Sequence, residues 1–115
     1  MTSEYINKNR DFFDEAYELG GSSLPDDVII KTYFLVLARE LGLTGEKNER
    51  LLDYGCGLGN NTSFYKSRGY DVYGVDVSKV AIEKCQEKMP DISEHFSTIA
   101  PEPVSGSLFD VDFDV

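Results

Sequence analysis

The sequence predicts an α/β domain built on a parallel sheet, and three observations support this prediction. Short apolar strand patterns alternate along the chain with segments of helical pattern. A glycine-rich turn at 55–59 follows the first strand and leads into a helix. An acid, Asp76, ends the second strand about 20 residues further on. This strand–helix–strand order implies parallel pairing with right-handed crossovers.

Two helices are predicted ahead of the first strand. Residues 3–19 carry aromatic and aliphatic side chains at helical spacing, and Gly20 and Gly21 end that helix. The second helix begins after the polar run 22–27 and continues to about Leu41. It is apolar almost all round from residue 28 to 38, so we expect it to be mostly buried.

The remaining elements follow the rhythm expected of a βαβαβ unit. The patterns predict strands at 51–54, 70–76 and 95–99, helices at 61–68 and 78–89, and a loop at 100–107. Ser78 is the predicted cap of the second of these helices, and Pro90 ends it. We therefore divide one domain, 1–115, into N-terminal helices at 1–45 and a cofactor-binding core at 46–115.

Composition excludes several classes of function. The 115 residues suit one domain, and a hydrophobic share of 41% suits a buried core. A formal net charge of -10 disfavours nucleic acid and anionic membrane as partners. Neither a membrane span nor a signal peptide is visible, so we expect a cytoplasmic protein. Cys56, Cys85 and His95 are too few for a zinc site, so we expect no metal.

The glycine turn has the features of a site for a nucleoside-bearing cofactor. Gly55 permits a backbone turn that a side chain would block. Gly57 and Gly59 let the chain pass close to a ligand, and residues 60–62 open the next helix with side chains that can cap it. Asp76 stands where a carboxylate accepts hydrogen bonds from both hydroxyls of a ribose.

Two departures from the dinucleotide pattern bear on the cofactor. The pattern G-x-G-x-x-G would place its third glycine at position 60, but this chain has Asn60 there and its glycine at 59. Asp53, two residues before Gly55, would repel a pyrophosphate and would suit a cationic ligand or an ammonium group. A nicotinamide-dependent, NAD(P)-binding oxidoreductase domain stays open as an alternative.

The stretch LDYGCGLG at 52–59 closely resembles the first motif of class I S-adenosylmethionine-dependent methyltransferases, and VYGVDVS at 72–78 looks like their second. The resemblance runs from about Asp26 to the C-terminus. It implies a Rossmann-like three-layer sandwich, S-adenosylmethionine as cofactor, and transfer of its methyl group. It also implies that Asp53 and the 55–59 loop lie beside the amino-acid part of the cofactor, that Asp76 binds the ribose, and that Val77 packs against adenine.

The resemblance thus defines a set of candidate cofactor-binding residues. They are Asp53, Tyr54, Gly55, Cys56, Gly57, Gly59, Asn60, Asp76, Val77, Ser97 and Ile99. The last two mark the family's third contact region, where an acid or amide is common and this chain has none until Glu102.

Catalytic residues stay unassigned at this stage. We expect His95 to have a packing or surface role, and Cys56 not to act as a nucleophile, because no histidine is near it in sequence to activate it. Four aromatic residues of the first helix could either cover the cofactor as a lid or pack in the core. They are Tyr5, Phe12, Phe13 and Tyr17.

The C-terminal residues 113–115 look like the start of the family's fourth strand, whereas family members continue through a seven-stranded sheet. The chain therefore resembles the cofactor-binding half of a methyltransferase, and a gene fragment, a split enzyme and a truncated enzyme are all compatible with this. The acidic chain favours a small-molecule acceptor. A non-catalytic interaction module derived from a methyltransferase is the other open alternative.

The same comparison with the family predicts an open sheet edge. The fourth strand would pair with the first, so a short fourth strand leaves one side of strand 51–54 exposed. We expect self-association through this edge or instability of the isolated chain, and weak cofactor binding by the 115 residues alone. The tail 109–115 alternates apolar and acidic side chains and is predicted to be a half-exposed strand or a frayed terminus.

Overall fold

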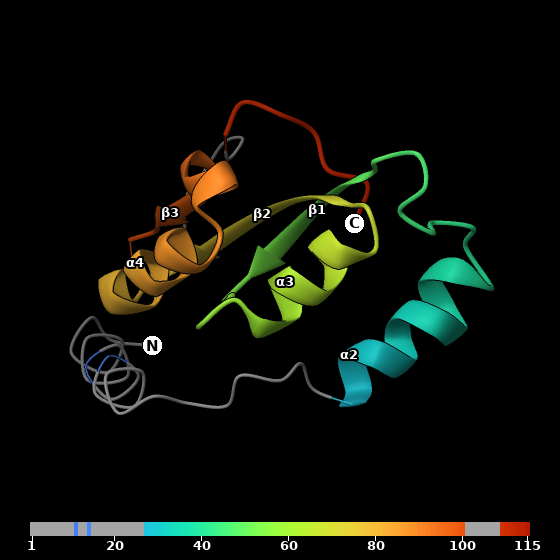
Figure 1. The fold of residues 1–115 in the computed structure, drawn as a ribbon, viewed down its shortest axis with the longest axis horizontal. Helices are drawn as coiled ribbons and strands as arrows, with labels where there is room; N and C mark the ends of the chain where they lie inside the picture. The colour runs from blue at the N-terminus through green and yellow to red at the C-terminus, as the bar shows by residue number, and fades with distance from the viewer. Residues whose placement is uncertain (1–10, 12–13, 15–26, 101–108) are drawn as a thin grey trace.

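The computed structural model describes residues 11, 14, 27–100 and 109–115 (Figure 1). Its centre is a parallel sheet of β1 (Arg50–Tyr54), β2 (Asp71–Asp76) and β3 (Phe96–Thr98), in the order β1-β2-β3. Leu51 pairs with Val72, and Gly74 pairs with Phe96. The α/β fold class with a parallel sheet is therefore confirmed.

Two helices connect the strands and lie on the same side of the sheet in Figure 1. They are α3 (Asn60–Ser67) and α4 (Lys79–Lys88). Both crossovers step in the same direction across the sheet, so right-handed connections put both helices on one face. The Ser78 hydroxyl accepts a hydrogen bond from the Ala81 N–H at 3.1 Å, which confirms the predicted cap of α4.

Two buried apolar clusters hold the helices on the sheet. The first joins Tyr33, Leu37, Leu51, Tyr65, Tyr70 and Val72. The second joins Cys56, Ile82, Cys85, Met89 and Phe96. Fully burying one large apolar side chain contributes about 1.5–3 kcal/mol, so each cluster is a substantial part of the stability. Because Cys56 belongs to the glycine turn, the second cluster fixes that turn against α4 and β3.

The helix before the sheet is shorter and more exposed than its sequence predicts. It consists of α2 (Asp27–Thr32) and a π-helical continuation, η1 (Tyr33–Ala38), and so ends before Leu41. Tyr33 and Leu37 are buried. The side chains on its other sides are exposed: Val28 67%, Phe34 50%, Leu35 48% and Val36 44%.

The prediction of a mostly buried helix is therefore wrong. The physical reason is that Tyr33 and Leu37 face α3 and β1 through the first cluster, and a helix that packs on one side against the described elements buries that face only. The predicted helix at 3–19 lies outside the described residues, apart from Asp11 and Asp14, which are both helical.

The C-terminal segment crosses over from the side of β3, and its end lies at the edge of β1 that does not pair with β2 (Figure 1). The N–H groups of Asp114 and Val115 donate to the Arg50 carbonyl at 2.8 and 3.1 Å, and the Leu52 N–H donates to the Val115 carbonyl at 3.0 Å. This is the bonding pattern of parallel strands, in the place where the fourth strand is predicted. Of the two alternatives predicted for 109–115, a strand that runs from residue 109 is excluded, because Phe109 has a left-handed φ of 61° that interrupts extended backbone.

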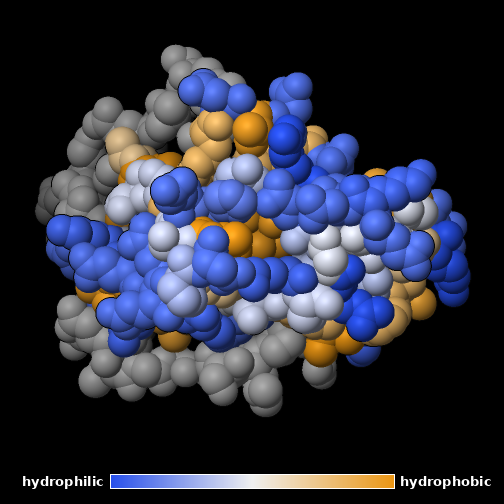
Figure 2. Space-filling model, turned by 45° about the horizontal axis from the view of Figure 1, so that its top comes forward, coloured by the Kyte–Doolittle hydropathy of each residue, from blue (hydrophilic) through white to orange (hydrophobic). Residues whose placement is uncertain are grey.

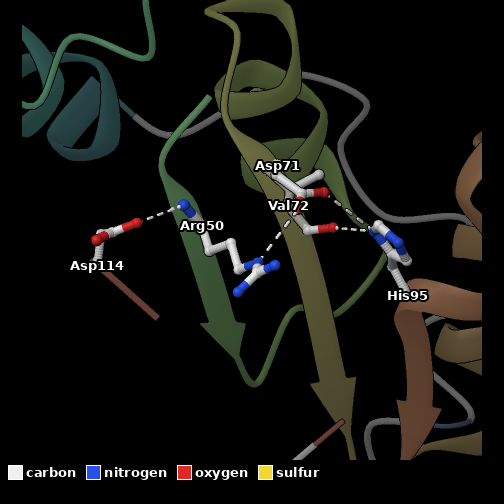
Figure 3. A network of polar contacts seen from close by, with 5 residues as sticks. All are labelled: Arg50, Asp71, Val72, His95 and Asp114. Carbon is white, nitrogen blue, oxygen red and sulfur yellow. Dashed lines mark hydrogen bonds and ion pairs between the residues drawn. The ribbon is translucent and has the colours of Figure 1, made fainter. Parts of the chain in front are cut away.

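A polar network ties the amino ends of the strands together (Figure 3). Asp114 accepts from the Arg50 N–H at 2.8 Å, and Asp71 lies 3.7 Å from the Arg50 guanidinium and 3.5 Å from His95 Nδ1. The His95 ring also stacks on Tyr73 with centroids 3.9 Å apart. His95 ends a short 3₁₀ helix, η2 (Pro90–His95), that replaces the predicted start of the third strand. The stacking on Tyr73 confirms the packing role that was one of the two expected for His95.

The molecular surface is mainly hydrophilic on the face shown in Figure 2, with apolar side chains visible in smaller areas between polar ones. This agrees with the 28% share of charged residues. Among the described segments, each helix is too short or too polar to cross a bilayer.

Candidate cofactor site

The glycine turn lies where the carboxyl ends of β1 and β2 meet, at the end of the sheet opposite His95. Gly55, Gly57 and Gly59 have φ values of 79°, 55° and 79°, which L side chains rarely adopt. The turn therefore depends on glycine at all three positions. In an α/β sheet, this carboxyl-end crevice is where ligands bind.

The N–H groups of the turn are largely engaged within the protein. Those of Gly55 and Cys56 donate to the Val75 carbonyl at 2.8 and 3.0 Å. The Gly57 N–H donates to Asp76 Oδ2 at 2.9 Å, and the Gly59 N–H donates to the Cys56 carbonyl at 3.0 Å. A phosphate-binding loop would direct such groups at the ligand, so this arrangement does not favour a pyrophosphate.

Asp76 has two roles in this geometry. It is 7% exposed, and its Oδ2 and Oδ1 atoms accept hydrogen bonds from the N–H groups of Gly57 and Ser78, each at 2.9 Å. The carboxylate thus joins the end of β2 to the glycine turn. A carboxylate oxygen accepts more than one hydrogen bond, so the same group retains capacity for ligand hydroxyls.

Asp53 is half-buried near the end of β1 and bonds to the first turn of α3. The Thr62 hydroxyl donates to Asp53 Oδ2 at 2.6 Å. Burial raises the pKa of Asp53, the Thr62 hydrogen bond opposes this rise, and the negative charge of Asp76 adds to it. Two carboxylates near one turn favour a cationic ligand.

The side chains of residues 60–62 were expected to cap α3, but no side chain caps its N-terminus in the structure. The capping position is Gly59, which has no side chain, and the Thr62 hydroxyl bonds Asp53 instead. Sequence reasoning missed this role of Thr62. The available signal was a threonine one turn into a helix whose preceding strand carries an acid.

Two thiols lie beneath the turn. Cys56 Sγ and Cys85 Sγ are 4.0 Å apart, and the Cys85 thiol donates to the Gly57 carbonyl at 3.1 Å. The neighbouring Cys85 thiol, followed by burial, raises the pKa of Cys56 far above its usual range. A thiol that stays protonated is a poor nucleophile, which agrees with the expectation that Cys56 does not act as one.

The family described as "Methyltransferase domain" matches residues 30–111 of this chain. The chain belongs to this methyltransferase family. The match includes the glycine turn, Asp53 and Asp76, and it ends at residue 111, before the residues that bond to β1. It leaves the alternative of an NAD(P)-binding oxidoreductase without support.

Solved structures of methyltransferases are similar to this methyltransferase chain. A TehB-like S-adenosylmethionine-dependent methyltransferase from Corynebacterium glutamicum is 17% identical, with a TM-score of 0.49, and the match covers 98% of this chain and 53% of that one. A candidate sarcosine dimethylglycine methyltransferase from Galdieria sulphuraria is 18% identical, with a TM-score of 0.48 and coverage of 76% and 40%. A candidate RNA methyltransferase from Pyrococcus horikoshii is 19% identical, with a TM-score of 0.47 and coverage of 89% and 52%.

The methyltransferase chain therefore spans about half the length of these three proteins, or less. A search of curated proteins found no match.

The other candidate residues of the methyltransferase chain lie at varying distances from Asp76. The Ile99 N–H donates to the Asp76 carbonyl at 3.0 Å, and Val77 follows Asp76 directly and is half-buried. Ser97 pairs with Val75, is exposed, and donates its hydroxyl to the Thr98 carbonyl.

Two candidates belong to the rim of the glycine turn. The Tyr54 side chain is 70% exposed at the end of β1. Asn60 Oδ1, at the start of α3, accepts from Lys88 Nζ at 2.7 Å. This bond between Asn60 and Lys88 joins the first turn of α3 to the last turn of α4.

One N-terminal residue reaches this end of the sheet. Ser78 follows Asp76 by two residues, and its hydroxyl donates to Asp14 Oδ1. Sequence reasoning did not single out Asp14. The aromatic residues considered as a lid, Tyr5, Phe12, Phe13 and Tyr17, lie outside the described residues.

Proposed function

We propose that this chain binds S-adenosylmethionine and forms the cofactor-binding part of a methyltransferase. The observation that carries the proposal is the pair of carboxylates, Asp53 and Asp76, beside a glycine turn whose N–H groups are largely engaged within the protein. S-adenosylmethionine has a sulfonium and an ammonium group, and it has no phosphate. Its charge therefore fits a site that is acidic and does not offer the usual donors for a pyrophosphate.

The proposed roles follow the placement of each residue. Asp76 accepts hydrogen bonds from the ribose hydroxyls, and Asp53 balances the charge of the ammonium group. Val77 and Ile99 provide apolar surface near Asp76 for the adenine ring. The turn at 55–59, which lacks side chains at three positions, allows the cofactor to approach the backbone closely.

The proposed reaction is methyl transfer to a small-molecule acceptor. When bound, the cofactor supplies a methyl group activated by the positive sulfonium. Such transfer depends chiefly on in-line positioning and on excluding water from the reacting groups. The net charge of -10 supports a small acceptor rather than a nucleic acid, and we propose a cytoplasmic location on the same compositional grounds.

We also propose self-association through the edge of β1. Val115 pairs with the first part of β1, whereas Tyr54 lies beyond that pairing and is 70% exposed. An extended edge of this kind pairs readily with another chain. Sedimentation velocity over a range of concentrations tests this, and a monomer at every concentration would contradict it.

Calorimetric titration with S-adenosylhomocysteine tests cofactor binding directly. We compare the wild type with Asp53→Asn, which keeps the side-chain shape and an acceptor for Thr62, and with Asp91→Asn. Asp91 is the matched control, because its carboxylate is exposed and pairs with Lys66 at 3.0 Å, and the charge change is the same. NADH serves as the ligand of the competing class.

The proposal predicts binding of S-adenosylhomocysteine by the wild type and Asp91→Asn, and affinity lower by 10-fold or more in Asp53→Asn. Binding of NADH in preference to S-adenosylhomocysteine would contradict it. So would an absence of heat with S-adenosylhomocysteine for a wild type that circular dichroism shows to be folded.

A further inference from the structure

Thr62 is fully buried, with 0% of its surface exposed, although it carries a hydroxyl group. It lies in the first turn of α3, next to the carboxyl end of β1. Its hydroxyl donates to Asp53 Oδ2 at 2.6 Å. The bond connects the helix after the glycine turn with the strand before it.

A second threonine shows the local bond that a helical hydroxyl commonly makes. The Thr32 hydroxyl in α2 donates to the Val28 carbonyl, four residues earlier, at 2.6 Å. This is the usual local bond of threonine in a helix. Thr62 instead directs its hydroxyl to a carboxylate nine residues away in sequence and in a different element.

We propose that Thr62 is a positioning residue for the cofactor, which fixes the Asp53 carboxylate through Oδ2 and leaves Oδ1 to accept from the cofactor ammonium. This inference rests on the proposed function. Thr62 is buried, so it acts on the ligand through Asp53. Its role is to hold both the direction and the charge of that carboxylate.

The charge of Asp53 needs such support. Burial and the nearby Asp76 carboxylate both favour its protonated form, and the pKa of Asp53 is raised as a result. The Thr62 hydrogen bond acts in the opposite direction, because it stabilises the ionised form. Without that bond, Asp53 takes up a proton at a higher pH and then no longer balances an ammonium group.

The test compares two ligands and three variants. S-adenosylhomocysteine carries the ammonium group, whereas 5′-methylthioadenosine keeps the adenosine and lacks the amino-acid part. Thr62→Val removes the hydroxyl and keeps the shape, and Thr62→Ser restores a hydroxyl. Thr32→Val is the matched control. It removes a threonine hydroxyl whose hydrogen bond has the same length, 2.6 Å, but which lies in α2, away from the glycine turn.

We expect Thr62→Val to bind S-adenosylhomocysteine on the order of 10-fold more weakly, a loss of about 1.4 kcal/mol. Its affinity for 5′-methylthioadenosine stays at the wild-type value. The acid limb of S-adenosylhomocysteine affinity moves to higher pH in Thr62→Val, and Thr62→Ser returns both properties towards wild type. Should Thr62→Val fail to fold, Thr62→Ala is expected to give the same selective loss.

Three results would overturn the inference. Equal binding of S-adenosylhomocysteine by Thr62→Val and wild type would show that the bond does not matter for the ligand. Equal loss of both ligands, with no change in the pH profile, would show a purely structural role. A folded wild type that binds neither ligand would refute the proposed function, and this inference with it.

Discussion

Replacing Asp76 by asparagine is expected to loosen the glycine turn before any ligand is added. The carboxylate accepts from the N–H groups of Gly57 and Ser78 with separate oxygens, each at 2.9 Å. Asparagine offers one oxygen, so its amide group would face the second N–H donor. Leaving a buried donor unsatisfied costs about 1–3 kcal/mol, and bonds to a charged acceptor lie at the upper end of that range.

We therefore expect Asp76→Asn to lower the free energy of unfolding by about 2–3 kcal/mol, measured by urea denaturation with circular dichroism. Amide exchange of Gly57 is expected to accelerate in the same variant, since its acceptor is lost. Asp91→Asn is the control for the charge change, because this exposed carboxylate is expected to leave stability close to wild type.

The reasoning is refuted if Asp76→Asn unfolds at the same urea concentration as Asp91→Asn. That result would mean that Asp76 does not hold the turn. It would also mean that any effect of Asp76 substitutions on ligand binding reports direct contact with the ligand alone.

Three further predictions concern the same end of the sheet. Gly59→Ala is expected to destabilise the protein by about 1–3 kcal/mol more than Gly55→Ala in urea denaturation. Both glycines have φ of 79°, but a Cβ at Gly59 would lie 2.9 Å from Cys85 Sγ, whereas Gly55 has open space. Because folding raises the pKa of Asp53 above 3.8, wild-type stability falls as pH rises from about 4 to that raised pKa, and Asp53→Asn lacks this fall. The Cys56 and Cys85 thiols are expected to react with a thiol reagent far more slowly in the folded protein than in urea, as measured by absorbance.

Each of these predictions has a clear contrary result. Equal destabilisation by the two alanine variants would show that strain in φ alone decides the cost. A constant difference in the free energy of unfolding between wild type and Asp53→Asn across that pH range would show that folding does not raise the pKa of Asp53. Rapid reaction of the native thiols would show that α4 does not cover the turn.

The strands and the turn could be predicted because their signals are local. Apolar runs that end in Asp53 or Asp76, with glycine at 55–59 between them, fix both the elements and their order. The hydrogen bond of Thr62 could not be predicted in the same way. It depends on how α3 packs against β1, and a buried threonine in a helix usually bonds its own backbone.

The exposure of α2 and η1 could not be predicted for a related reason. An apolar sequence all round a helix shows that its surface suits burial, but it does not show how many sides are covered, and Phe34 and Val28 stay 50% and 67% exposed. The sequence leaves a strand and a frayed terminus open for 109–115, and the left-handed φ of Phe109, which alternating hydrophobicity does not reveal, excludes a strand over the whole segment. Its last two residues still lie beside β1 as predicted.

The central claim is that the acidic turn between β1 and α3 is a site for S-adenosylmethionine. Two-dimensional NMR of the ¹⁵N-labelled chain, titrated with S-adenosylhomocysteine, tests it most directly. We predict saturable shifts that are concentrated in the amides of residues 53–62 and 76–78. Shifts confined to the opposite end of the sheet, around Arg50, Asp71 and His95, would contradict the claim, as would a spectrum that does not change.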